Sequence, residues 1–263
     1  MSADQLTMLT RRILIVNDDG VQSRGIALLE QVARGFGGEV FVVAPDEERS
    51  GAGQSISLSI PLRVRQIEAN RFAVKGSPAD CVMLAIRALL KDKPPTLVLS
   101  GVNHGENLAD DVAYSGTSGA AMEAAQFGIP AIAFSQVREL GQMPNFDVAE
   151  KHIEEVLSKL LAVPWREGLV FNVNFPAVPG GEITGIEMVP VGRRVRRPFY
   201  PIEGKDGRNI PYYWVGVDYA HDIEATPGTD LASVRKRAIS VTPLRRDPTD
   251  DYMLDQLEHL FKS

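Results

Sequence analysis

The chain has 263 residues, of which 44% are hydrophobic and 24% charged, and this is the composition of a globular protein with a sizeable core. Its formal net charge of −6 excludes a general attraction to nucleic-acid polymers or anionic membranes and favours small-molecule partners. The single cysteine, Cys81, excludes a disulfide framework, and the lack of a long apolar run predicts a soluble, cytoplasmic protein.

Apolar runs of strand length alternate with helix-length amphipathic segments through the first half of the chain. The expected strands are "RILIVN" (12–17), "EVFVVAP" (39–45), "TLVLSGVN" (96–103) and "IPAIAFS" (129–135). The expected helices are 23–36 and 77–91, the second with Ser77 as its N-cap. Residues 62–76 read as two strands around a turn. This alternation indicates an α/β fold in which helices cover both faces of a mostly parallel sheet.

The second half of the chain adds another helix and further strands. Residues 148–162 have a helical apolar period, and "GLVFNVNFP" (168–176) and "ITGIEMVPVG" (183–192) read as strands. The region from Arg193 to about Ala225 predicts a projecting hairpin whose aromatic side chains need a partner surface. Those side chains are Phe199, Tyr200, Tyr212, Tyr213, Trp214 and Tyr219, and the arginines expected on a solvated face are Arg193, Arg194, Arg196 and Arg197.

Oxygen-bearing side chains follow the expected strands. Asp18 and Asp19 come directly after the first strand, Ser50 follows the second, and Asn103 ends the third. In open parallel sheets ligands bind at this edge, so we expect these side chains to lie close together. Carboxylate, hydroxyl and amide oxygens favour Mg²⁺ or Mn²⁺ over zinc.

A run of small residues precedes the alanine-rich helical segment near position 120. Ser115, Gly116, Thr117 and Ser118 would place backbone N–H groups and hydroxyls at a helix N-terminus, which attracts phosphate. A divalent cation facing such an anion site favours hydrolysis of phosphate esters.

Each of these features has a simpler interpretation that stays open. Two acidic residues before a glycine are common in plain turns, and Gly, Ser and Thr at a helix start often serve only as a cap.

His104, beside Asn103, is a candidate proton donor to the leaving group. His152 and His259 fit helical patterns and are expected to be structural, while His221 has no assigned role.

Six motifs occur in order along most of the chain: "ILIVNDDG", "VVAPDEERSGAGQSIS", "GSPADCV", "LVLSGVNHGENLADDVAYSGTSGAAMEA", "FNVNFP" and "GTD...ISVTPL". Together they resemble the SurE (stationary-phase survival protein) family of metal-dependent 5'/3'-nucleotidases. The resemblance implies a Rossmann-like three-layer αβα sandwich. It places a catalytic core at 1–145 and a C-terminal region at 146–263 that completes the core and carries an oligomerisation hairpin at about 193–225.

The resemblance also assigns roles to individual positions. It implies one divalent metal ion per subunit, Mg²⁺ or Mn²⁺, with ligands at Asp18, Asp19, Ser50 and Asn103, and catalytic roles for Asp18, Asp19 and Asn103. The phosphate-binding positions fall on Gly51, Ser115, Gly116 and Thr117. Members form homodimers or homotetramers and release phosphate from nucleoside 5'- and 3'-monophosphates by metal-assisted attack of water; some also hydrolyse short-chain polyphosphate. His104 stands where relatives often carry another residue.

Three other functions compete with this interpretation. Phosphatases with an aspartyl nucleophile separate their two aspartates by one residue, whereas Asp18 and Asp19 are adjacent. A receiver-like signalling module also binds magnesium through an acidic pair, but it is much shorter than this chain. A dinucleotide-binding oxidoreductase needs a glycine fingerprint that "NDDGVQSRG" does not provide.

Overall fold

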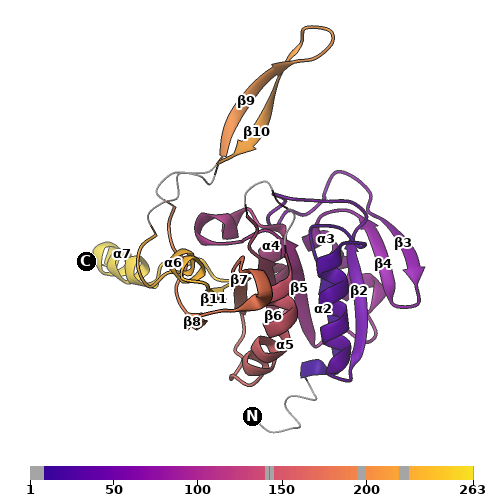
Figure 1. Ribbon diagram of the computed structural model, residues 1–263, viewed down its shortest axis with the longest axis horizontal. Helices are drawn as coiled ribbons and strands as arrows, with labels where there is room; N and C mark the ends of the chain where they lie inside the picture. The colour runs from indigo at the N-terminus through magenta and orange to yellow at the C-terminus, as the bar shows by residue number, and fades with distance from the viewer. Residues whose placement is uncertain (1–8, 140–141, 143–144, 195–198, 219–224, 263) are drawn as a thin grey trace.

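A nine-stranded sheet forms the centre of the computed structural model, which describes residues 9–139, 142, 145–194, 199–218 and 225–262 (Figure 1). In spatial order its strands are β3 (Arg63–Glu68), β4 (Arg71–Lys75), β2 (Glu39–Pro45), β1 (Arg12–Val16), β5 (Leu97–His104), β6 (Ala131–Gln136), β7 (Leu169–Phe175), β11 (Ala238–Arg245) and β8 (Gly185–Met188). The six strands from β4 to β7 are parallel to one another. At the edges, β3 is antiparallel to β4 and β11 is antiparallel to β7. The expected α/β class with a mostly parallel sheet is confirmed.

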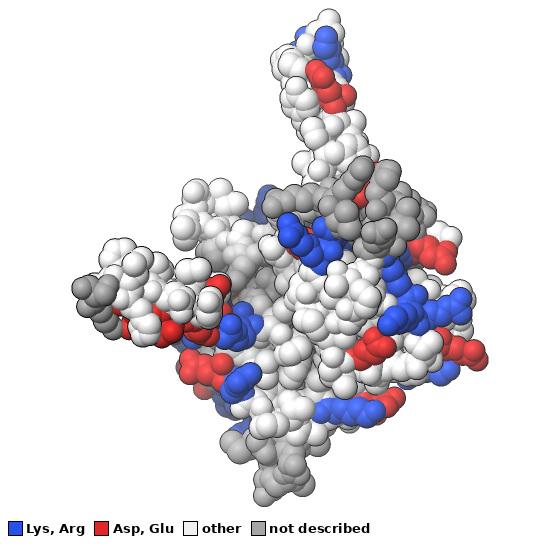
Figure 2. Space-filling model, turned by 90° about the vertical axis from the view of Figure 1, so that its left-hand side faces the viewer, with Lys and Arg blue, Asp and Glu red and all other residues white. Residues whose placement is uncertain are grey.

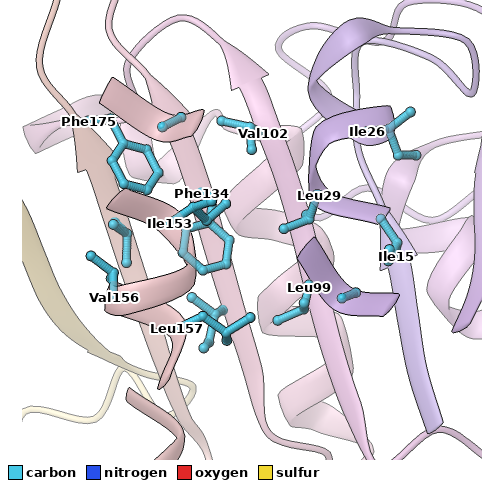
Figure 3. Close-up of a cluster of buried hydrophobic side chains, with 14 of the residues drawn as sticks. Ile15, Ile26, Leu29, Leu99, Val102, Phe134, Ile153, Val156, Leu157 and Phe175 are labelled. Atoms are coloured by element: carbon cyan, nitrogen blue, oxygen red, sulfur yellow. The ribbon is translucent and has the colours of Figure 1, made fainter. Parts of the chain in front are cut away.

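Helices cover both faces of this sheet. α2 (Arg24–Gly35) and α5 (Asp147–Leu161) pack on one face, and α3 (Pro78–Leu84) and α4 (Gly116–Gln126) on the other. Alternate side chains of β1 enter the two cores: Ile13 and Ile15 join the α2 side, whereas Leu14 and Val16 join the α3 side. Figure 3 shows the first of these cores, in which Leu29 and Ile153 lie against the sheet.

The start of α3 follows the expected capping pattern. Ser77 Oγ accepts a hydrogen bond from the Asp80 N–H, and the Asp80 carboxylate accepts one from the Ser77 N–H. The next helical turn, Ala85–Leu89, has π-helical hydrogen bonding. Cys81 is fully buried within the core.

The predicted hairpin is present and projects from the body of the protein (Figure 1). It consists of β9 (Phe199–Lys205) paired antiparallel with β10 (Pro211–Val217). Figure 2 shows that much of its surface carries neither acidic nor basic side chains. Tyr213 and Trp214 are 66% and 68% exposed, so the expectation of uncovered aromatic side chains holds for the described part. Tyr219 and His221 lie outside the described residues.

The expectation of a solvated arginine face before the hairpin is wrong for Arg194. This side chain is buried and forms an ion pair with the Asp111 carboxylate, to which its Nε donates at 3.2 Å. Its backbone N–H also donates to Asp110 Oδ2 at 2.9 Å. Arg193 is exposed as expected, and Arg196 and Arg197 lie outside the described residues.

Short elements complete the chain. The 3₁₀ segments are η2 (Ala109–Ala113) and η3 (Pro179–Gly181), and the last helices are α6 (Asp230–Arg235) and α7 (Asp251–Lys262). No helix in the described part of the chain is long and apolar enough to span a bilayer. The division into 1–145 and 146–263 stays a prediction, although α5, β7, β8 and β11 extend the same sheet and its helical layer.

Candidate active site

A cavity of about 190 Å³ opens at the carboxyl ends of β1 and β5. The strand order reverses beside β1, because the chain passes from β1 to β2 on one side and later enters β5 on the other. Such a reversal leaves a crevice between neighbouring loops, which is where open α/β sheets bind ligands. The predicted site residues that line the cavity are Asp18, Ser50, Gly51, Asn103 and Ser115.

The first turn of α4 contacts the side chain of Asp18 and fixes its position. The residue is 4% exposed, and its Oδ1 accepts a 2.6 Å hydrogen bond from Thr117 Oγ1. A Cβ on Gly116 would lie 2.8 Å from Asp18 Oδ2, so glycine at 116 permits this close approach. Burial raises the pKa of Asp18, and hydrogen bonds from the side chain and backbone of Thr117 oppose that increase.

Asp19 lies beside the end of β5. Its side chain is 8% exposed, and its Oδ2 accepts a 3.1 Å hydrogen bond from the His104 N–H. Burial, followed by the negative charge of Asp18, raises the pKa of Asp19 to about 8. Among the described residues, no lysine or arginine forms an ion pair with Asp18 or Asp19.

The loop after β2 carries Ser50 and Gly51 to the cavity. Two contacts to the α4 region fix this loop: the Gly53 N–H donates to Tyr114 O at 2.9 Å, and a Cβ on Gly119 would lie only 2.3 Å from Gly53 O. Ser50 itself is exposed and donates to Glu48 Oε1 at 2.7 Å. Its hydroxyl oxygen therefore keeps lone pairs for a further partner.

Asn103 reaches the cavity from β5. Its Nδ2 donates to Gly105 O at 3.0 Å, which fixes the orientation of the amide. No hydrogen bond from a described residue reaches its Oδ1. The amide oxygen is therefore available to a ligand in the cavity.

Ser115 caps α4, as the simpler interpretation expected. Its Oγ accepts a 2.9 Å hydrogen bond from the Ser118 N–H, while the residue still lines the cavity. Gly116 and Thr117 are buried behind it and do not line the cavity. The Thr117 hydroxyl is thus bound to Asp18, and its phosphate-binding role stays a prediction, as does that of Gly116.

His104 lines the cavity and lies 3.6 Å, through Nδ1, from Asp19 Oδ1. The ring packs edge-on against Phe146, and its buried Nε2 has no hydrogen-bond partner among the residues that the structure describes. Burial lowers the pKa of His104. At a given pH, the protonated form that would donate a proton to the leaving group is therefore less populated than in an exposed histidine.

Several lining residues were not assigned to the site from the sequence, namely Gly105, Glu106, Asn107, Asp111, Tyr114, Arg138, Phe199 and Val217. The position of Arg138 could have been predicted from the sequence, because it follows β6 and residues directly after parallel strands lie at the ligand-binding edge of the sheet. Among the described residues, no carboxylate pairs with this exposed arginine. Asn107 is positioned by the Asn174 and Ser135 side chains, at 2.8 Å each.

The donor set fits a hard divalent cation. Asp18 lines the cavity, whereas the adjacent Asp19 does not, and neither forms an ion pair with a lysine or arginine in the described part of the chain. Ser50 and Asn103 bring a hydroxyl and an amide oxygen to the same cavity. Within the described ranges, no cluster of three or more His, Cys, Asp or Glu side chains has the arrangement of a metal site. Asp18, Asp19, Ser50 and Asn103 carry oxygen atoms of the type that could hold such an ion.

Comparisons with known proteins agree with this architecture. Residues 13–198 match the family model described as Survival protein SurE. A 5'-nucleotidase SurE from Parvibaculum lavamentivorans is 46% identical over 242 residues, covering 90% of this chain and 86% of that protein. Another, from Beijerinckia indica subsp. indica, is 46% identical over 251 residues, covering 94% and 95%.

A solved structure shows the same fold. The crystal structure of the SurE protein from Aquifex aeolicus has a TM-score of 0.79 and 38% sequence identity, covering 95% of this chain and 99% of that one. Because the family model spans most of the sequence and these relatives span nearly all of it, this chain belongs to the SurE family.

Proposed function

We propose that the chain is a divalent-metal-dependent phosphatase that hydrolyses nucleoside 5'-monophosphates to nucleoside and phosphate. The observation that carries this proposal is the meeting of Asp18, Ser50, Asn103 and Ser115 at one cavity, from four separate parts of the chain. The relatives named 5'-nucleotidase SurE, which align over at least 90% of the chain, support the same reaction.

Asp18, Asp19, Ser50 and Asn103 are proposed to hold one Mg²⁺ or Mn²⁺ ion per subunit. When bound, such an ion polarises a phosphoryl oxygen and lowers the pKa of water or orients it for attack. The charge of the ion would offset the repulsion between Asp18 and Asp19, which burial makes costly. Thr117 acts through Asp18, because its hydroxyl fixes one carboxylate oxygen.

The phosphate group is proposed to lie between the Ser50–Gly51 loop and the start of α4. Gly51, Ser115, Gly116 and Thr117 are the positions assigned to it, and α4 directs its positive dipole end toward this part of the cavity. Arg138 adds an exposed guanidinium whose charge suits a phosphate dianion. Water attacks phosphorus directly in this scheme, so no phosphorylated aspartate forms.

The proposal extends to nucleoside 3'-monophosphates and short-chain polyphosphate, whose terminal phosphates present the same group to the site. It also includes assembly into a homodimer or homotetramer. The exposed aromatic side chains of β9 and β10 support assembly, because a large uncovered apolar surface on a projecting hairpin favours association.

The test is phosphate release from a panel of nucleoside 5'- and 3'-monophosphates and short polyphosphate, with Mg²⁺, Mn²⁺ or chelator. We expect metal-dependent turnover of 5'-monophosphates and its loss in Asp18→Asn and Asp19→Asn. Normal turnover in chelator, or normal metal-dependent turnover in both variants, would refute the assignment. Hydrolysis of a substrate with an isotopically chiral phosphate should invert the configuration at phosphorus if water attacks directly, whereas an aspartyl-phosphate route, with its two displacements, would retain it.

A further inference from the structure

Two aromatic side chains form part of the cavity wall. Tyr114 and Phe199 both line the cavity and are 42% and 38% exposed. Their ring centroids lie 5.0 Å apart with an interplanar angle of 74°, which is an edge-to-face contact. Most other lining side chains are polar or are glycine, so these rings are the main apolar feature of the wall.

The two rings come from distant parts of the chain and are fixed differently. Tyr114 directly precedes the N-cap of α4, and its carbonyl accepts the hydrogen bond that ties down the Ser50–Gly51 loop. Phe199 is the first residue of β9 and pairs across the hairpin with Val217, which also lines the cavity. The base of the projecting hairpin therefore forms part of the cavity wall.

We propose that Tyr114 and Phe199 form the platform that holds the nucleobase of the substrate, so that the hairpin base determines the preference for nucleotides over other phosphate esters. This inference rests on the proposed nucleotidase activity. The phosphate would occupy the metal end of the cavity while the base lies against the two rings, with the ribose between them.

The chemistry of the platform predicts how selective it is. Every base has a π-face, so stacking on aromatic side chains tolerates all four bases. The platform should thus separate phosphate esters that carry a base from those that do not. It should discriminate little between purines and pyrimidines.

The experiment compares AMP with ribose 5-phosphate, which keeps the ribose and the 5'-phosphate but lacks the base. In the full-length protein with Mn²⁺, Phe199→Ala and Tyr114→Ala should each raise KM for AMP about tenfold, since a stacked base is worth a factor of this order. Kinetic constants for ribose 5-phosphate should change less than twofold. Phe199→Tyr and Tyr114→Phe should retain the wild-type KM for AMP, because each substitution keeps an aromatic ring at its position.

Trp214→Ala provides a matched control, because Trp214 lies on β10 of the same hairpin but does not line the cavity. This variant should leave the ratio of the AMP and ribose 5-phosphate constants unchanged. An equal loss on both substrates in Phe199→Ala and Tyr114→Ala, or no loss on either, would overturn the platform. If the wild type hydrolyses ribose 5-phosphate but no nucleotide, the proposed function itself fails.

Discussion

Thr117 Oγ1 donates a 2.6 Å hydrogen bond to Asp18 Oδ1, and both side chains are almost fully buried. The two residues are 99 positions apart in the sequence, and the first turn of α4 brings them together. This contact fixes one oxygen of Asp18 and turns its carboxylate toward the cavity. Thr117 is thus placed to set the geometry of the proposed metal ligand.

Replacing Thr117 by valine tests this positioning role. Thr117→Val keeps the shape but leaves a buried acceptor without its donor, which costs about 1–3 kcal/mol. We expect a lower midpoint in urea unfolding and a Mn²⁺ concentration for half-maximal activity raised about tenfold. Thr117→Ser, which keeps a hydroxyl, should recover most of the metal affinity. A valine variant with unchanged metal dependence would contradict the assignment.

The sheet and its ligand-binding edge were predictable because their signals are local. The apolar run of β1 shows directly in the sequence, and the parallel topology then places Asp18, Ser50 and Asn103 at one edge. The N-cap role of Ser115 was similarly visible as one of two open interpretations. Periodicity and strand-end position were sufficient for these inferences.

The remaining contacts were not predictable because they join residues far apart in the chain. The burial of Arg194 depends on Asp111, 83 residues away, and nothing in "RRVRR" separates this arginine from its exposed neighbour Arg193. Phe199 reaches the cavity only because the hairpin begins beside Tyr114. The aromatic composition of this segment predicted an exposed hairpin, but it did not predict that the base of the hairpin lines the cavity.

The raised pKa of Asp19 predicts how pH affects the metal-free protein. A carboxyl whose pKa rises from 3.8 in the unfolded chain to about 8 in the fold contributes stability that is fully present below pH 4. That contribution is lost as pH rises toward 8, because the carboxyl of the unfolded chain releases its proton above pH 4 whereas the folded one keeps it until about pH 8. In chelator, the melting temperature should fall more steeply between pH 5.5 and 8.5 for wild type than for Asp19→Asn.

Metal should reverse this trend, because the ion binds the ionised carboxylates and competes with protons. The increase in melting temperature on adding Mn²⁺ should be larger at pH 8 than at pH 6 in wild type and absent in Asp19→Asn. Equal pH slopes for the two proteins in chelator would mean that Asp19 ionises normally.

The lack of a side chain at Gly119 allows the loop that carries Ser50 to pack directly against α4. A Cβ at this position would lie 2.3 Å from Gly53 O, so Gly119→Ala should displace the loop. We expect kcat/KM to fall more than tenfold, despite the roughly 1 kcal/mol by which alanine normally favours a helix over glycine. Gly35→Ala at the end of α2 meets nothing within 4 Å and should keep full activity. Full activity in Gly119→Ala would show that the loop position is unimportant.

Arg138 should act on the phosphate and not on the base. Its guanidinium lines the cavity without a carboxylate partner among the described residues. Removing it should therefore weaken the binding of all phosphate esters to a similar extent. Arg138→Met should raise KM for AMP and for ribose 5-phosphate by a similar factor of about ten, and Arg138→Lys should recover part of the loss. An effect confined to AMP would instead assign Arg138 to the nucleoside.

The exposed face of the hairpin should mediate association between copies of the chain. Tyr213 and Trp214 each expose about two thirds of their surface, and Val215 beside them is 72% exposed. Replacing Tyr213 and Trp214 together by serine removes aromatic area that drives association, so light scattering at micromolar concentration should show a smaller assembly than wild type. Lys205→Ser and Arg208→Ser near the hairpin turn serve as a charged-residue control and should keep the wild-type mass. A monomeric wild-type protein would contradict this prediction and would mean that these aromatic side chains stay exposed to solvent.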